Sequence, residues 1–161
     1  MTNNILARAV LVPAILALGA CAGTNTIRTS QNTAIVQASA APVCGGIGAA
    51  RVAQKQAAIE TIKAGYDRYV IVGAAAADNV HVAQMPGSYQ TTGVVNGGYL
   101  NATTTYRPGP TMVYGSHDQN FGIRMFHDGE PGASNAISAR QTLGDKWQEM
   151  VKAGSVRTCT S

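Results

Sequence analysis

Apolar residues recur with strand-like spacing in three segments of this chain. Residues 33–40 predict a first strand, and residues 121–127, in which apolar side chains occupy every second position, predict another. Between them, Tyr69–Val72 is a continuous run of aromatic and β-branched residues. Such a run is typical of a central strand that is covered on both faces.

Two other segments predict helices. The alanine-rich residues 47–63 form the first, Gly65 caps its C-terminus, and the strands on either side complete a β-α-β unit. The second helix begins near Ser134 or Asn135 and ends at Gly154. Its apolar side chains recur at helical spacing at Ala136, Ala139, Leu143, Trp147 and Met150. Gly144 is its weak point, because glycine in a helix interior costs about 1 kcal/mol relative to alanine.

Residues 77–115 differ in composition from the rest and are rich in Gly, Asn, Thr and Tyr. They form either an irregular loop or a protruding hairpin, and the turn signal Asn96-Gly97 favours the hairpin. The whole pattern predicts an α+β fold: a small mixed sheet with two helices on one face and a Gly/Tyr-rich hairpin insertion. About 140 residues suit one domain, which we expect to span 30–161.

The N-terminal residues 1–20 have the layout of a secretory signal peptide: a basic start, an apolar run and small residues at its end. The sequence Leu18–Cys21 resembles the lipobox of bacterial lipoproteins. This resemblance implies cleavage before Cys21, lipidation of its thiol and, because no aspartate follows, sorting to the outer membrane facing the periplasm. The alternative is an ordinary cleaved signal with a chance cysteine. Residues 21–29 are small and polar and predict a flexible lipidated tether.

The charges of the chain argue against one class of partner, and its cysteines predict a disulfide. Without its leader the chain has 11 basic and 8 acidic residues, and the basic ones are scattered, which argues against a nucleic-acid partner. Lipidation of Cys21 leaves Cys44 and Cys159 in an oxidising compartment. We expect a disulfide between them, the alternative being two separate thiols.

Several apparent chemical motifs have ordinary explanations. Ser116-His117-Asp118 has the residue types of a hydrolase triad, but adjacent side chains point apart, so we expect no catalytic residues and no enzyme activity. The glycines of residues 46–51 suit a tight turn better than a dinucleotide fingerprint. His81, His117 and His127 lack the spacing of a metal site, so we expect no metal and no cofactor.

Four tyrosines gather in the inserted segment, and tyrosine offers a large contact area with a polar tip. Tyr99, Tyr106 and Tyr114 are therefore our candidate partner contacts, unless the rings only stabilise the hairpin by cross-strand pairing. These observations predict a lipid-anchored envelope protein that acts as an interaction or structural module, with the membrane and an envelope protein as partners. The alternative function is a small-molecule or metal-binding envelope lipoprotein that uses His117 and His127.

Three short segments add a family resemblance: residues 30–33, 57–60 and Gly65–Tyr69. They resemble a group of small bacterial lipoproteins in which a strand is followed by an alanine-rich helix ending in Gly-Tyr-Asp and an aromatic strand. The expected architecture is also similar to the lipoprotein sensor of the Rcs envelope-stress phosphorelay, which joins a tether to a small disulfide-bonded α+β domain. Neither resemblance implies an enzymatic activity.

Overall fold

The computed structural model describes residues 21–160. The predicted signal peptide, residues 1–20, lies outside the described residues, so its cleavage stays a prediction. The first part of the chain contains β1 (Ala22–Arg28), β2 (Thr33–Ala40), the 3-10 turn η1 (Pro42–Cys44), α1 (Gly45–Lys63) and β3 (Arg68–Asp78).

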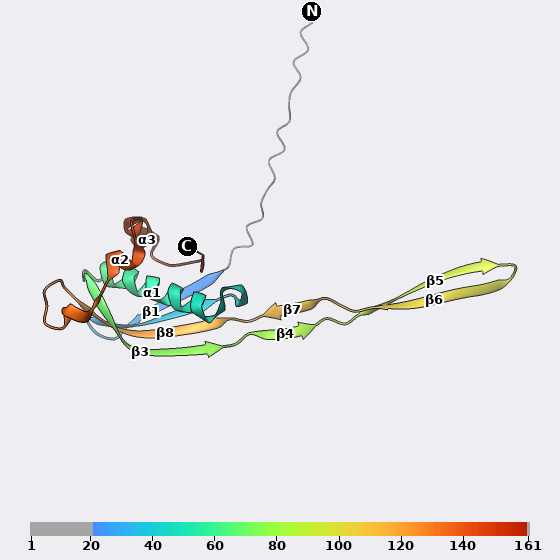
Figure 1. Ribbon diagram of the computed structural model, residues 1–161, viewed down its shortest axis with the longest axis horizontal. Coiled ribbons are helices and arrows are strands. Elements are labelled where there is room, and N and C mark those ends of the chain that lie inside the picture. Colours follow the sequence, from blue (N-terminus) through green and yellow to red (C-terminus); the bar gives the residue numbers. More distant parts are fainter. Residues whose placement is uncertain (1–20, 161) are drawn as a thin grey trace, which may run out of the picture.

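A long extended excursion follows β3 and returns as β8. It contains β4 (His81–Gln84), β5 (Ser88–Asn96), β6 (Tyr99–Arg107) and β7 (Thr111–Tyr114), and β8 spans His117–Phe126. The chain ends with η2 (Ala133–Asn135), β9 (Ile137–Ser138), α2 (Ala139–Leu143) and α3 (Trp147–Ala153). Figure 1 shows a helix-covered body at one end and the excursion reaching away from it.

The body is built on a five-stranded sheet in the order β1-β2-β8-β3-β9, with every neighbouring pair antiparallel. β2 and β3 therefore run in the same direction with β8 between them, so the expected β-α-β unit is present in a split form. α1 packs across one face of this sheet, and α2 and α3 extend the helical layer by packing against α1 (Figure 1). The α+β prediction is confirmed.

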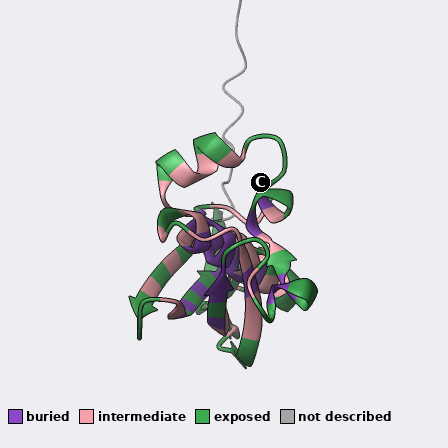
Figure 2. Cartoon of the chain, turned by 90° about the vertical axis from the view of Figure 1, so that its left-hand side faces the viewer, coloured by how far each residue is buried: buried purple, intermediate pink, exposed green. Residues whose placement is uncertain are grey.

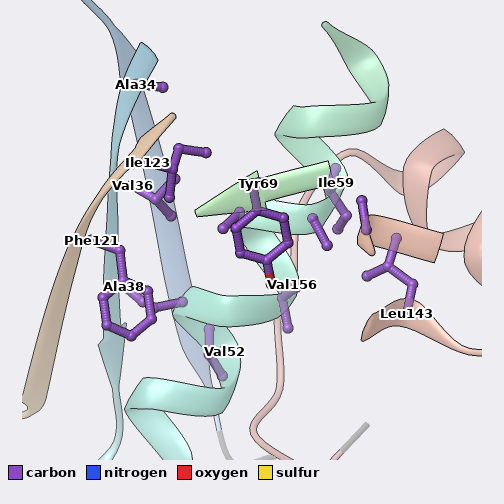
Figure 3. Close-up of a cluster of buried hydrophobic side chains, with 14 of the residues drawn as sticks. Ala34, Val36, Ala38, Val52, Ile59, Tyr69, Phe121, Ile123, Leu143 and Val156 are labelled. Carbon is purple, nitrogen blue, oxygen red and sulfur yellow. The ribbon is translucent and has the colours of Figure 1, made fainter. Parts of the chain in front are cut away.

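The core lies between α1 and the sheet face that it covers. Every second residue of β2, from Ala34 to Ala40, is buried against the helix. Larger side chains fill the space between the small ones, and Figure 3 shows Val36, Ile59, Tyr69 and Ile123 converging there. The alanines of α1 let the helix approach the sheet closely. Figure 2 shows this buried layer enclosed by exposed residues.

A buried glutamine connects three parts of the body that are distant in sequence. The Gln56 amide oxygen on α1 accepts hydrogen bonds from Thr24 Oγ1 of β1 and from the backbone N–H of Val156. Its amide nitrogen donates to the carbonyl of Gly154. These bonds satisfy a buried polar group and tie the C-terminal segment to the helix.

Three predictions about elements are wrong. Residues 21–29 are not a tether: residues 22–28 form β1, which pairs with residues 34–40 of β2. The strand over Tyr69–Val72 is not covered on both faces, because the helices lie on one side and Val72 is 66% exposed. The last helix is divided, because Gly144 adopts φ +72° and ends α2, and α3 begins at Trp147.

Candidate interaction arm

The most distinctive surface is the excursion between β3 and β8, and we call residues 79–116 the arm. Its outgoing and returning chains pair as β4 with β7 and as β5 with β6. At about 3.3 Å per residue, the outgoing chain from Asp78 to Asn96 extends about 60 Å. The predicted hairpin is confirmed, but it continues the pairing of β3 with β8 instead of forming a separate insertion (Figure 1).

Asp118 joins the two chains at the neck of the arm. Its carboxylate accepts hydrogen bonds from Asn79 Nδ2 at 2.7 Å and from Ser116 Oγ at 3.0 Å. A side-chain hydrogen bond from Ser39 is the main reason that the pKa of Asp118 lies below its usual value. The backbone also closes here, because Asn79 N–H donates to the carbonyl of Ser116. The neck therefore links the arm to β2 as well as to β3 and β8.

A proline-rich joint divides the arm into two ladders. Pro86, Pro108 and Pro110 lie between the β4–β7 ladder and the β5–β6 ladder, and proline has no N–H to donate to a ladder. One hydrogen bond spans the joint, from Met85 N–H to the carbonyl of Pro110. A Cβ at Gly109 would overlap the Met85 carbonyl oxygen, so glycine allows the chains to approach closely here.

At its far end the arm reverses through Gly97 and Gly98. Their φ angles are +57° and +86°, and Asn96 pairs with Tyr99 across the turn. Positive φ at both central residues is the geometry of the two-residue hairpin turns that match strand twist. The turn lies one residue later than the Asn96-Gly97 signal suggests.

The β5–β6 ladder has two different faces. Residues directly opposite each other in an antiparallel pair share a face, and successive residues alternate between faces. One face, which we call the tyrosine face, carries Tyr89, Thr91, Gly93, Val95, Leu100, Ala102, Thr104 and Tyr106. The other, the polar face, carries Ser88, Gln90, Thr92, Val94, Asn96, Tyr99, Asn101, Thr103, Thr105 and Arg107.

Cross-strand contacts order the side chains of the tyrosine face. The rings of Tyr89 and Tyr106 lie 5.0 Å apart between centroids, and Thr91 and Thr104 hydrogen bond through their hydroxyls at 2.8 Å. A Cβ at Gly87 would overlap the Tyr106 ring, so glycine leaves room for that ring. The face is therefore a fixed strip of aromatic, aliphatic and methyl groups.

The arm is exposed and almost uncharged. Arg107 is its single formally charged residue, and none of its residues is buried. Tyr89 is 75% exposed and Tyr99 is 80% exposed. Both outer edges of the β5–β6 ladder carry backbone groups without a neighbouring strand in the described chain. Edges of soluble sheets are normally protected by charge, proline or a covering segment, and residues 88–106 have none of these.

The structure brings together only some of the candidate contact residues. Tyr106 lies on the tyrosine face beside Tyr89, whereas Tyr99 lies on the polar face next to the turn. Tyr114 belongs to β7, where its ring lies 5.5 Å from that of His81. The sequence did not single out the pairing of Tyr89 with Tyr106. With the turn placed at Gly97-Gly98, Tyr89 and Tyr106 are each the eighth residue from the turn and therefore pair directly across the ladder.

The residues of the apparent chemical motifs have structural contacts instead. Ser116 Oγ donates to Asp118, while His117 Nδ1 lies 3.4 Å from Asp78. His117 and His127 stand at opposite ends of β8, so the residues of the metal-binding alternative are not gathered. Within residues 21–160, no three His, Cys, Asp or Glu side chains form a group suited to a metal ion.

The three cysteines occupy one end of the body. Cys44 and Cys159 form the predicted disulfide, which is confirmed. Cys21 is exposed and is a free thiol. Its carbonyl accepts a hydrogen bond from Ala41 N–H, and its backbone bridges to Thr158. The candidate lipidation site and the disulfide therefore lie next to each other.

No family model, curated protein or solved structure matches this chain. The resemblance to small envelope lipoproteins therefore stays a prediction. Among the helices of the described residues, none has the length and apolar character needed to cross a bilayer.

Proposed function

We propose that this chain is a lipid-anchored protein of the bacterial cell envelope that binds a protein partner through its arm. The observation that carries the proposal is the tyrosine face: an ordered apolar strip, exposed on a ribbon with one charge. Such a strip has the composition of an interface core, in which aromatic residues are enriched and charged residues are depleted.

The energetics of a two-stranded ribbon support binding. An isolated hairpin is marginally stable in water, and a third strand or a packed surface stabilises it. A partner that docks on the tyrosine face or pairs with an edge of the β5–β6 ladder would supply that stabilisation. The bonds around Asp118 hold the near end of the arm, which reduces the conformational entropy lost on binding.

A photo-crosslinking residue in the β5–β6 ladder tests the proposal. Benzoylphenylalanine replaces Tyr106 in one version of the full-length protein and Thr105, which faces the opposite side, in another. We expect irradiation of intact cells to give one dominant adduct from position 106 and much less from position 105. A dimer-sized adduct would identify the partner as a second copy. Equal labelling from both positions, or no adduct, would contradict the proposal.

Matched substitutions then measure how much the tyrosine face contributes to the affinity for the partner. The Tyr89→Ser, Tyr106→Ser double variant removes one cross-strand pair of the tyrosine face, and Gln90→Ser, Thr105→Ser removes the adjacent pair of the polar face. Central interface aromatics each contribute about 2 kcal/mol or more, and the losses at neighbouring positions do not simply add, so the double tyrosine variant should weaken affinity for the crosslinked partner at least about 30-fold. The polar-face variant should bind as the unchanged protein does.

A further inference from the structure

We infer that the end of the body around Cys21 rests directly on an anionic lipid bilayer, through an anchor face made of Val43, Ile47, Arg51 and Lys55. The inference rests on the lipid anchor of the proposed function and goes beyond it. It assigns a second membrane contact that belongs to the folded domain and sets how the domain stands on the membrane.

The first observation is that no spacer separates Cys21 from the folded domain. β1 begins at Ala22, whose N–H donates to the carbonyl of Arg157 at 2.7 Å. Cys21 itself accepts from Ala41 and bridges to Thr158. Acyl chains on the Cys21 thiol would therefore bring the surrounding surface to the headgroup layer.

The second observation is that exposed aliphatic side chains lie beside this point. Val43 is 82% exposed and Ile47 is 74% exposed, near the start of α1. Val43 follows Ala41, the residue bonded to Cys21, by two positions. It also lines a shallow hollow with Pro42, Val80 and Val113, which extends the apolar surface to the base of the arm.

The third observation is the charge beside the aliphatic residues. Ile47, Arg51 and Lys55 are spaced four residues apart and share one side of α1. Arg51 and Lys55 line a hollow with Val52 and residues 158–160, and no acidic residue lines it. Basic residues next to exposed aliphatic ones suit anionic headgroups, because the aliphatic groups enter the interface while the cations stay at the phosphates.

Two points of attachment would fix the orientation of the domain. A single acylated residue on a flexible tether allows the domain to rotate freely. With β1 starting at the anchor and α1 touching the headgroups, the arm keeps one angle to the membrane. The base of the arm, where Val80 and Val113 share a hollow with Val43, would then mark where the arm leaves the bilayer surface.

Depth-dependent quenching tests the inference on the lipidated full-length product in vesicles of phosphatidylcholine and phosphatidylglycerol that carry brominated acyl chains. Trp147 is the single tryptophan and is changed to Phe, and one new tryptophan is introduced as Ile47→Trp. The control is Ile27→Trp, because Ile27 lies at the far end of β1 on the sheet face opposite α1 and is 50% exposed. We expect strong quenching at position 47 and none at position 27.

The charge contribution is tested by adding Arg51→Gln to the Ile47→Trp protein. Each cation near an anionic surface contributes about 1 kcal/mol to binding, so losing Arg51 should lower the ratio of docked to undocked molecules about fivefold. The quenching of the tryptophan at position 47 should fall with that ratio. It should also fall in vesicles of phosphatidylcholine alone. Mass spectrometry of the N-terminal peptide on the same sample distinguishes a failure of the anchor face from a failure of the proposed lipid anchor on Cys21. Acylated Cys21 with no quenching at position 47 overturns only the anchor face, whereas an unmodified Cys21 overturns both.

Discussion

Tyr69 brings a phenol into the core with none of its surface exposed. Its hydroxyl lies 3.3 Å from the Gln54 carbonyl oxygen, to which it donates, and 3.3 Å from Thr142 Oγ1. The ring thus connects β3 to α1 and α2 (Figure 3). Burial disfavours the charged phenolate and raises the pKa of Tyr69, although the two hydrogen bonds act in the opposite direction.

This raised pKa predicts a loss of stability at high pH. The contribution of Tyr69 is complete below the pKa of an unfolded tyrosine, about 10, and is lost as pH rises through the higher pKa of the folded state. Tyr69→Phe should lower the free energy of unfolding by about 1 kcal/mol at pH 8, for its lost hydrogen bonds, and should flatten the decline above pH 10.

Urea unfolding at pH 8 and at pH 11 measures both effects. Tyr106→Phe serves as the control, because its ring lies on the exposed arm, and it should follow the unchanged protein at both values. An equally steep alkaline decline in the Tyr69→Phe protein would show that another group is responsible.

At the scale of single elements, the sequence predicts the strands and helices whose own residues carry the hydrophobic pattern. The bounds of β2 agree with the expected residues 33–40, because its alternation directly reflects one buried face. β1 was missed because Gly23 and Asn25 have little strand preference of their own, and their pairing with Ser39 and Gln37 stabilises the extended conformation. The continuation of β3 through Ala74–Ala77 depends in the same way on residues 118–121.

The candidate site was predictable in kind but not in geometry. The composition of residues 77–115 and the Asn96-Gly97 signal indicate a hairpin with tyrosines. Which tyrosines share a face depends on the turn residues, and a shift of one residue changes the pairing across the ladder. Tyr99, Tyr106 and Tyr114 could therefore be proposed together from the sequence, although the register separates them.

Destabilising the Gly97-Gly98 turn should affect the arm and leave the core unchanged. Gly98→Ala places a Cβ on a residue with φ +86°, which should destabilise the β5–β6 ladder by about 1 kcal/mol. Amide hydrogen exchange should accelerate in residues 88–107 and stay unchanged in β2 and β8. Gly97→Asn is the matched control, because asparagine tolerates a φ of +57°. Acceleration in β2 would contradict an arm that folds independently of the core.

At the scale of the whole molecule, the disulfide closes the body on itself. Cys44 precedes α1 and Cys159 lies at the opposite end of the domain sequence, 115 residues away. The chain approaches closely here: a Cβ at Gly48 would lie 2.9 Å from that of Cys44 and 3.4 Å from that of Cys159. Glycine on α1 therefore makes room for a bridge that holds the C-terminal segment beside Cys21.

Removing this bridge should cost more stability than any other change proposed. A closed loop of this length restricts the unfolded chain enough to contribute about 5 kcal/mol, if strain in the folded state is small. We expect Cys44→Ser, Cys159→Ser to lower the free energy of unfolding in urea by about this amount. Cys21→Ser is the control, because its thiol lies outside the bridge, and should unfold as the unlipidated parent does. Equal stability of the double variant would mean that strain in the folded state offsets the restriction of the unfolded chain.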